Sequence, residues 1–160
     1  MTIQERAEVD LSRRNAMKKA GNLGLLGLLA SIGLTPNLAE AGLSAAAFDA
    51  KSLDAALDAL GGLIATENAA IQITAPEIAE NGTVVPVTVD CSLAQVEQIS
   101  ILVEKNPTIL AAHFVISKRA TGFVNTKIKM AQTSNVIALV KANGKFYRTS
   151  KEVKVSAGGC

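Results

Sequence analysis

Short segments that alternate between apolar and polar residues limit the folds open to this chain more than any other feature. The clearest is 124–130, where every second residue from Val124 is apolar or threonine and the residues between are Asn125, Lys127 and Lys129. A period of two places successive side chains on opposite faces of a β-strand. This segment is therefore predicted to be a half-buried strand.

Similar short segments recur along the chain from residue 70 onward. The other predicted strands are 71–74, 84–91, 99–104, 112–117, 136–140, 145–149 and 152–156. Asn143-Gly144 predicts a two-residue hairpin turn between two of them. Pro86 has no N–H to donate, so the strand that contains it is expected at a sheet edge or at a bulge. Without helices between the strands, the pattern favours a mainly β, antiparallel sandwich over a parallel sheet.

An alanine-rich segment at 45–60 precedes the strands, with Phe48, Leu53, Ala56, Leu57 and Leu60 at helical spacing. We expect a helix laid on the domain through this apolar stripe. Ser52 is a candidate N-cap for its second part, which would make the first part a separate short helix. The glycine pair at 61–62 is expected to end the helical segment.

The N-terminal region has the features of an export signal. Two adjacent arginines, Arg13 and Arg14, precede an uncharged apolar stretch from Ala20 to Ala39, and Ala39-Glu40-Ala41 is a small-x-small cleavage site. The arginine pair favours the twin-arginine route, with cleavage after Ala41 and release into a bacterial periplasm. A resident transmembrane helix is the weaker alternative, because four glycines dilute the stretch.

Composition narrows the possible functions of the mature chain. Removal of residues 1–41 leaves 11 Lys plus Arg against 10 Asp plus Glu, a near balance that argues against nucleic-acid binding. A single histidine excludes a blue-copper site of two histidines and a cysteine, and the absence of a C-x-x-C motif excludes a thioredoxin-like dithiol and covalent haem. A structural zinc site is not expected from this composition. We therefore expect no metal and no cofactor, and export together with a partner subunit.

The sequence reaches a cysteine directly after two glycines, at Gly158-Gly159-Cys160. Glycines give a narrow and flexible stalk, so the thiol of Cys160 is positioned to reach other molecules rather than to pack. From the last strand at Val155, five residues would span about 17 Å. The expected organisation is a signal peptide (1–41), a helical segment (42–66), a β-sandwich (67–156) and a flexible carrier arm (157–160).

Other reactive residues have simpler interpretations. Cys91 lies on the apolar face of its strand and is expected in the core, although a disulfide between Cys91 and Cys160 is an alternative in an oxidising compartment. His113, inside a strand, is expected to be a surface or hydrogen-bonded histidine. Lys127 and Lys129, with Lys118-Arg119, form either a solvated strand face or a positive strip that guides an anionic partner.

Several motifs together resemble the SoxY family of sulfur-oxidation carrier proteins. They are the twin-arginine leader, Ala75-Pro76-Glu77-Ile78-Ala79-Glu80-Asn81-Gly82 before Val84-Val85-Pro86-Val87, Glu104-Lys105-Asn106-Pro107, and Val153-Lys154-Val155 ahead of Gly158-Gly159-Cys160. The resemblance implies an immunoglobulin-like sandwich, a heterodimer with a SoxZ subunit and a carrier role in periplasmic thiosulfate oxidation. In that role, Cys160 would hold sulfur intermediates while separate Sox enzymes load, hydrolyse and oxidise them.

Two features depart from the family pattern: the sequence stops at Cys160 where two more glycines usually follow, and Cys91 is an additional cysteine. A carboxylate on Cys160 would disfavour its thiolate, so activation by partner enzymes is expected. A different class of function is an exported immunoglobulin-like interaction module whose terminal cysteine forms a crosslinking disulfide. A thiol enzyme is not expected, because no residue is evidently placed as its base.

Overall fold

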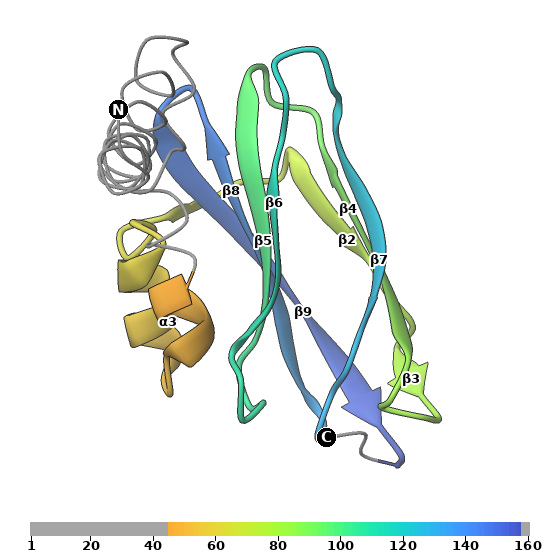
Figure 1. Ribbon diagram of the computed structural model, residues 1–160. Helices are drawn as coiled ribbons and strands as arrows, with labels where there is room; N and C mark the ends of the chain where they lie inside the picture. Colours follow the sequence, from red (N-terminus) through yellow and green to blue (C-terminus); the bar gives the residue numbers. More distant parts are fainter. Residues whose placement is uncertain (1–44, 158–160) are drawn as a thin grey trace, which may run out of the picture. The chain divides into compact units, whose positions relative to one another are not determined.

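The computed structural model describes residues 45–157, which form two packed β-sheets and a short helical segment (Figure 1). The helix α3 spans Leu53–Ala59, and residues 45–49 form a separate helical turn before it. The strands are β1 (Thr66–Glu67), β2 (Ile71–Thr74), β3 (Ile78–Ala79), β4 (Val85–Cys91), β5 (Val96–Val103), β6 (Leu110–Val115), β7 (Gly122–Ile128), β8 (Ser134–Ala142) and β9 (Lys145–Val155). The predicted mainly β, immunoglobulin-like sandwich is confirmed.

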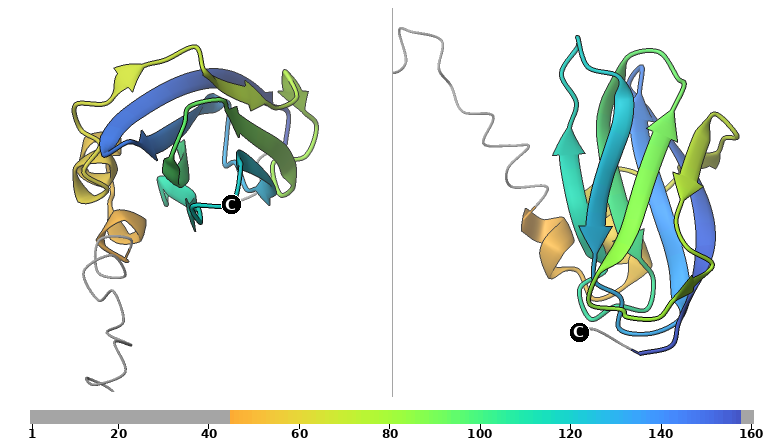
Figure 2. Two further views of the ribbon diagram at one scale, coloured as in Figure 1. Left: turned by 90° about the horizontal axis from the view of Figure 1, so that it is seen from above. Right: turned by 90° about the vertical axis from the view of Figure 1, so that its right-hand side faces the viewer.

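The larger sheet has the strand order β1-β9-β8-β5-β6, and β3 also pairs with β9. The smaller sheet has the order β2-β4-β7. Most pairings are antiparallel, but β1 and β3 pair with β9 in parallel, which the sequence pattern did not indicate. In the left view of Figure 2, the edge strands β6 and β7 lie on the side of the sandwich away from β9.

The core between the sheets is aliphatic, as expected from a sequence with few aromatic residues. In β4 the side chains alternate, with Val85, Val87, Val89 and Cys91 buried. They face buried residues of the larger sheet such as Val140. The alternation seen in the sequence therefore corresponds to one face turned to the core and one turned to solvent.

A second apolar cluster lies on the other face of the larger sheet, under α3. Leu57 is 1% exposed and joins Leu139 and Leu102, which are fully buried, in this cluster. Because β5 and β8 are covered on both faces, they read as continuous apolar runs rather than as alternating ones.

The predicted ends of the helix are confirmed. The Ser52 hydroxyl accepts a hydrogen bond from the Ala55 N–H at 3.2 Å, which makes Ser52 the N-cap of α3. After α3 the backbone adopts a left-handed conformation at Gly61, with φ of 75°. Phe48, expected in the apolar stripe, is 41% exposed, because it belongs to the separate first turn.

The hairpin at Asn143-Gly144 is confirmed, since both residues have positive φ, at 51° and 71°. Two predicted strands after it, 145–149 and 152–156, are a single strand, β9. The polar residues between them are accommodated because β9 is half-buried along most of its length. Strands β5 and β6 begin earlier than predicted, at Val96 and Leu110.

The expectation that Pro86 lies in an edge strand or at a bulge was wrong for the strand as a whole. Strand β4 is the central strand of the smaller sheet, and its pairing with β7 runs without a register shift. However, β2 pairs only with the second half of β4, from Thr88 to Cys91. Pro86 therefore lies where one flank of β4 has no neighbouring strand, and a missing N–H is tolerated there.

Candidate functional site

The residues proposed from the sequence to carry the chemistry, Gly158, Gly159 and Cys160, lie outside the described residues, as do Arg13 and Arg14. The structure does describe the chain up to Ala157, directly before the glycines. The candidate site is therefore defined by how the fold holds the residues that precede Cys160.

Strand β9 ends at Val155, shortly before the two glycines, and its last residues pair in parallel with β3. Lys154 N–H donates to the Glu77 carbonyl at 2.9 Å, and Ser156 N–H donates to the Ala79 carbonyl at 3.0 Å. Val155 N–H donates to Thr133 Oγ1 at 3.0 Å on the opposite flank. Because β9 is hydrogen bonded on both flanks, its last residues are held as firmly as a central strand.

Gly82 provides the last of these anchors. Its N–H donates to the Ala157 carbonyl at 2.7 Å, and its own carbonyl accepts from Met130 N–H at 2.8 Å. The turn that carries Gly82 is fixed by the Asn81 side chain, which accepts from Thr83 N–H at 2.9 Å. No pattern in the sequence indicated the hydrogen bond between Gly82 and Ala157.

These anchors shorten the arm relative to the sequence estimate. The chain is held through Ala157 rather than released at Val155, so three residues, not five, separate the anchored backbone from the thiol. Their Cα atoms can extend at most about 11 Å from Ala157. An enzyme that acts on Cys160 must therefore bring its reactive group close to this end of the sandwich.

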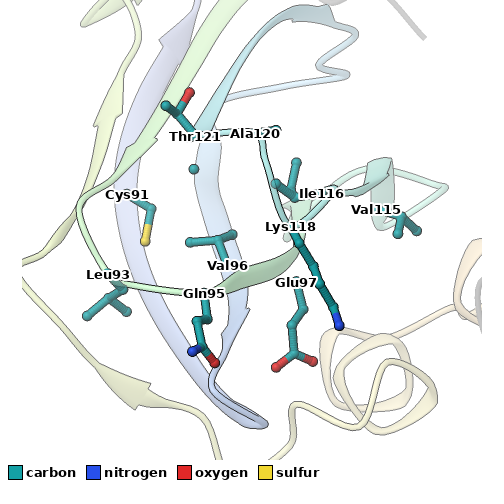
Figure 3. A pocket seen from close by; sticks show the side chains of 11 residues that line it. Cys91, Leu93, Gln95, Val96, Glu97, Val115, Ile116, Lys118, Ala120 and Thr121 are labelled. Carbon is teal, nitrogen blue, oxygen red and sulfur yellow. The ribbon is translucent and has the colours of Figure 1, made fainter.

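Cys91 is a core residue and takes no part in the arm. It is 5% exposed and forms no disulfide. Burial raises the pKa of its thiol, with a smaller raising effect from Asp90, while a backbone hydrogen bond from Leu93 lowers it. Its sulfur points into a cavity of about 740 Å³ between β5, β6 and β7 (Figure 3). Because the thiol is buried and its pKa is raised, it is a poor nucleophile.

The alternative disulfide between Cys91 and Cys160 conflicts with the positions of their backbones. Ala157 is bonded to Gly82, just before β4 begins, whereas Cys91 is the last residue of β4. The strand between them is about 20 Å long. Since Cys160 can extend only about 11 Å from Ala157, the two Cα atoms cannot approach within the roughly 7 Å that a disulfide requires unless the anchors break.

His113 has the hydrogen-bonded role expected for it. Its Nδ1 lies 2.8 Å from the hydroxyl of Ser100, which is fully buried in β5. The pair joins neighbouring residues of β5 and β6, and no thiol takes part in it. The hydroxyl is enclosed in the sheet, so this contact satisfies a buried polar group rather than activating a nucleophile.

The basic residues at the end of β7 are exposed and lie beside a second hollow. Lys127 and Lys129 line a cavity of about 420 Å³ together with Asn106, Leu110 and Phe48. Within residues 45–157, no cluster of three or more histidine, cysteine or acidic side chains could bind a metal. In the same range no helix is long and apolar enough to span a membrane.

Comparison with known proteins finds a solved structure that resembles this chain in both fold and sequence. It is the sulfur carrier protein SoxY from Chlorobium limicola f thiosulfatophilum, 44% identical, with a TM-score of 0.59 over 65% of this chain and 96% of that chain. A superoxide reductase (neelaredoxin) from Ignicoccus hospitalis is only 16% identical, with a TM-score of 0.49 over 53% of this chain and 79% of its own. Among curated proteins nothing matches the sequence.

The sequence model of one protein family, described as sulfur oxidation protein SoxY, matches residues 57–160. The match begins within α3, at Leu57, and includes strands β1 to β9 and the Gly-Gly-Cys segment. The chain therefore belongs to the SoxY family of sulfur oxidation proteins.

Proposed function

We propose that this chain is a covalent sulfur carrier in thiosulfate oxidation, and that the thiol of Cys160 holds the sulfur. The observation that carries the proposal is that the family match extends through Cys160, while the described hydrogen bonds hold the chain up to Ala157, directly before the two glycines. The similarity to a sulfur carrier protein at 44% identity supports the same role. The carrier itself catalyses nothing, and separate Sox enzymes act on the group that it holds.

The first step joins the Cys160 sulfur to the outer sulfur of thiosulfate. The S–H bond of Cys160 breaks, a sulfur–sulfur bond forms, and one proton and two electrons leave, so an oxidising enzyme must accept the two electrons. Water can then cleave the terminal sulfonate as sulfate and leave one extra sulfur on Cys160, without any change in electron count. Each step needs the sulfur of Cys160, free or carrying its group, inside an enzyme pocket, which a glycine stalk with no side chains permits.

The hydrogen bonds that hold the chain before Gly158 favour such transfers. If β9 frayed, the thiol would explore a larger volume and enter a pocket less often in a productive orientation. Hydrogen bonds from Lys154, Ser156 and Gly82 fix the point from which the arm starts. The short tether thus limits the orientational entropy lost when an enzyme binds the thiol.

The leader at Arg13-Arg14 supports a periplasmic location, reached by the twin-arginine route. This route carries folded proteins, so it fits export together with a SoxZ-like subunit as a heterodimer. The Sox enzymes that load, hydrolyse and oxidise the carried sulfur would be the further partners in that compartment.

Incubation of the reduced mature protein with thiosulfate and the oxidising Sox enzyme tests the proposal. Intact-mass spectrometry should show one thiosulfate adduct that needs both reagents and disappears on treatment with a reducing thiol. If the only product is a dimer joined through Cys160, the chain is a crosslinking module rather than a carrier.

A further inference from the structure

The cavity of about 740 Å³ beside Cys91 plays no part in the carrier function described above. Cys91 is the last residue of β4, whereas Gly82 lies just before β4 begins, so a strand of about 20 Å separates the cavity from the anchor of the arm. The Cα atom of Cys160, which can extend at most about 11 Å from Ala157, stays distant from it. Any role of this cavity is therefore separate from the carried sulfur.

The cavity follows from the sizes of paired residues in the smaller sheet. Val89 of β4 pairs with Val124 of β7, and both side chains are buried in the core. Farther along the same ladder, Cys91 pairs with Gly122, which has no side chain. A Cβ atom on Gly122 would lie 2.6 Å from the Cys91 carbonyl oxygen, so no larger residue can fill the space from this position. The inner layer therefore loses volume here, and a hollow lined by both sheets remains (Figure 3).

Hydrogen bonds hold the walls of the cavity in place. The connection between β4 and β5 is tied to the hairpin turn, because Asn143 N–H donates to the Gln95 carbonyl at 3.2 Å and the Asn143 side chain donates to the Ala94 carbonyl at 2.9 Å. On another wall, Ile116 N–H donates to the Glu97 carbonyl at 2.8 Å. A cavity with fixed walls needs little ordering when a ligand binds, and its volume lies in the range typical of small-molecule sites.

Most of the lining is apolar. Leu93, Val96 and Ile116 contribute aliphatic surface, and Cys91 contributes a buried thiol. Val115 is 63% exposed, so it lies where the cavity opens to solvent. An apolar group that entered the cavity would remove this surface from water, which is favourable.

The lining also contains a cation that is available to a ligand. Lys118 is exposed and forms no ion pair with any described residue. Glu97, the acidic residue of the lining, is already engaged by Gly144 N–H at 2.7 Å and by Lys141 at 3.3 Å. Figure 3 shows Lys118 and Glu97 on the side of the cavity away from Cys91. The cavity thus combines an apolar interior with a positive charge near its opening.

We propose that this cavity binds a small amphiphilic anion, whose apolar body enters between the sheets towards Cys91 and whose carboxylate or similar group pairs with Lys118. A medium-chain carboxylate such as octanoate has this chemistry. The binding is non-covalent, because the buried thiol of Cys91 is a poor nucleophile. This second site does not depend on the carrier function of Cys160.

Two other occupants fit the cavity less well. Insertion into a bilayer needs a broad exposed apolar surface beside the basic residues, but among the lining side chains only Val115 is a large hydrophobic group that is mainly exposed. A small inorganic anion would use Lys118 alone and leave the apolar interior uncovered. A free molecule with an apolar body and one anionic group satisfies both parts of the lining.

Calorimetric titration of the full mature chain with octanoate tests the site. The wild type should reach half-saturation below about 1 mM octanoate, whereas acetate, which has the charge without the chain, should give no saturable binding. Octanol, which has the chain without the charge, should bind at least about threefold more weakly than octanoate, because it cannot pair with Lys118.

A charge reversal tests the role of Lys118. Lys118→Glu should weaken octanoate binding by about tenfold or more and leave the affinity for octanol within about twofold. Arg119→Glu is the matched control, because Arg119 is exposed in the same connection but does not line the cavity. This control should alter the octanoate affinity by less than about threefold, since solvent and salt screen the more distant charge.

A larger side chain in the lining tests whether the ligand enters the cavity. Ala120 lines it and is exposed, so Ala120→Phe should fold normally but occupy space that the ligand needs. Octanoate and octanol should both bind about tenfold or more weakly to this variant. Ala55→Phe, which adds the same side chain at an exposed position of α3, should leave both affinities unchanged. Thermal unfolding checks that both variants remain folded.

Three results would overturn the proposal: no saturable binding of octanoate to the wild type, equal weakening by Lys118→Glu and Arg119→Glu, or wild-type affinity in Ala120→Phe. The thiosulfate adduct on Cys160, measured on the same samples, should form as in the wild type. Loss of the adduct in Ala120→Phe alone would show that the cavity is not separate from the carrier function.

Discussion

Gly82 donates its N–H to the carbonyl of Ala157 at 2.7 Å and thereby fixes the last described residue before the Gly-Gly-Cys segment. Gly82 also accepts a hydrogen bond from Met130 N–H, which follows β7. One glycine therefore connects the starting point of the arm to the smaller sheet. In the carrier that we propose, three residues, the last of them Cys160, follow this anchored point.

The anchor can be tested by removing one donor. Ser156→Pro deletes the N–H that donates to the Ala79 carbonyl at 3.0 Å. Because the carbonyl loses its partner, the free energy of unfolding should fall by about 1–3 kcal/mol in urea denaturation. Ala157→Pro is the matched control, since the Ala157 N–H donates to none of the described residues. Equal losses in both variants would show that the Ser156 bond contributes nothing specific.

The glycine stalk makes a different prediction. Gly158→Pro/Gly159→Pro stiffens and widens the chain before Cys160, so the initial rate of thiosulfate loading by the oxidising enzyme should fall by about tenfold or more. The melting temperature should not change, because the described hydrogen bonds at this end of the chain involve Ala157 and residues before it. An unchanged loading rate would contradict the view that a narrow, flexible stalk is needed for entry into the enzyme.

The two cysteines should differ in reactivity. Cys91 is 5% exposed and burial raises its pKa, so the neutral thiol persists to higher pH than in an ordinary cysteine. Native protein treated with iodoacetamide near pH 8 should therefore be modified once, at Cys160, and modified twice only after unfolding in urea. Rapid labelling of Cys91 in the native state would show that its cavity admits reagents and that its thiol is not inert.

Glu97 predicts a small dependence of stability on pH. The Gly144 N–H donates to Glu97 at 2.7 Å and holds the pKa of this carboxyl below its ordinary value, with a smaller contribution from Lys141. A lowered folded pKa stabilises the protein above the unfolded pKa of about 4.3, and the stabilisation is lost as pH falls through the folded value.

The variant Glu97→Gln isolates this effect. At pH 7 it should be less stable than the wild type by under about 1 kcal/mol, because the side chain is 42% exposed and solvent screens its charge. Urea denaturation at a series of pH values should show the difference shrinking below about pH 4. A difference that stays constant down to pH 2 would assign the loss to packing instead.

The sandwich could be predicted from the sequence because its strands and turns have local sequence patterns. Alternation identified β4 and β7, and Asn143-Gly144 identified the turn between β8 and β9. The parallel pairing of β3 with β9 could not be predicted, because it joins Ile78 to Lys154 across most of the domain and leaves no local pattern. For the same reason the length of the arm was overestimated, since the bonds of Gly82 and Ala79 are long-range contacts.

The candidate site likewise has features that local sequence predicts and features that only the fold reveals. The role of Cys160 and its two glycines stays a prediction from residue types, whereas the predicted burial of Cys91 on the apolar face of β4 is confirmed. The placement of the basic residues needed the fold, because Lys118 precedes β7 and Lys129 follows it, and β7 is known to be an edge strand only from the strand order of the sheet. Surface sites built from several elements depend on topology, which periodicity does not encode.

The most direct test of the central claim locates the carried sulfur on the chain. The wild type, Cys160→Ser and Cys91→Ala are each incubated with thiosulfate and the oxidising Sox enzyme, and the adduct is mapped by peptide mass spectrometry. We predict an adduct on Cys160 in the wild type and in Cys91→Ala, and none in Cys160→Ser. An adduct that persists in Cys160→Ser, or one found on Cys91, would contradict the account.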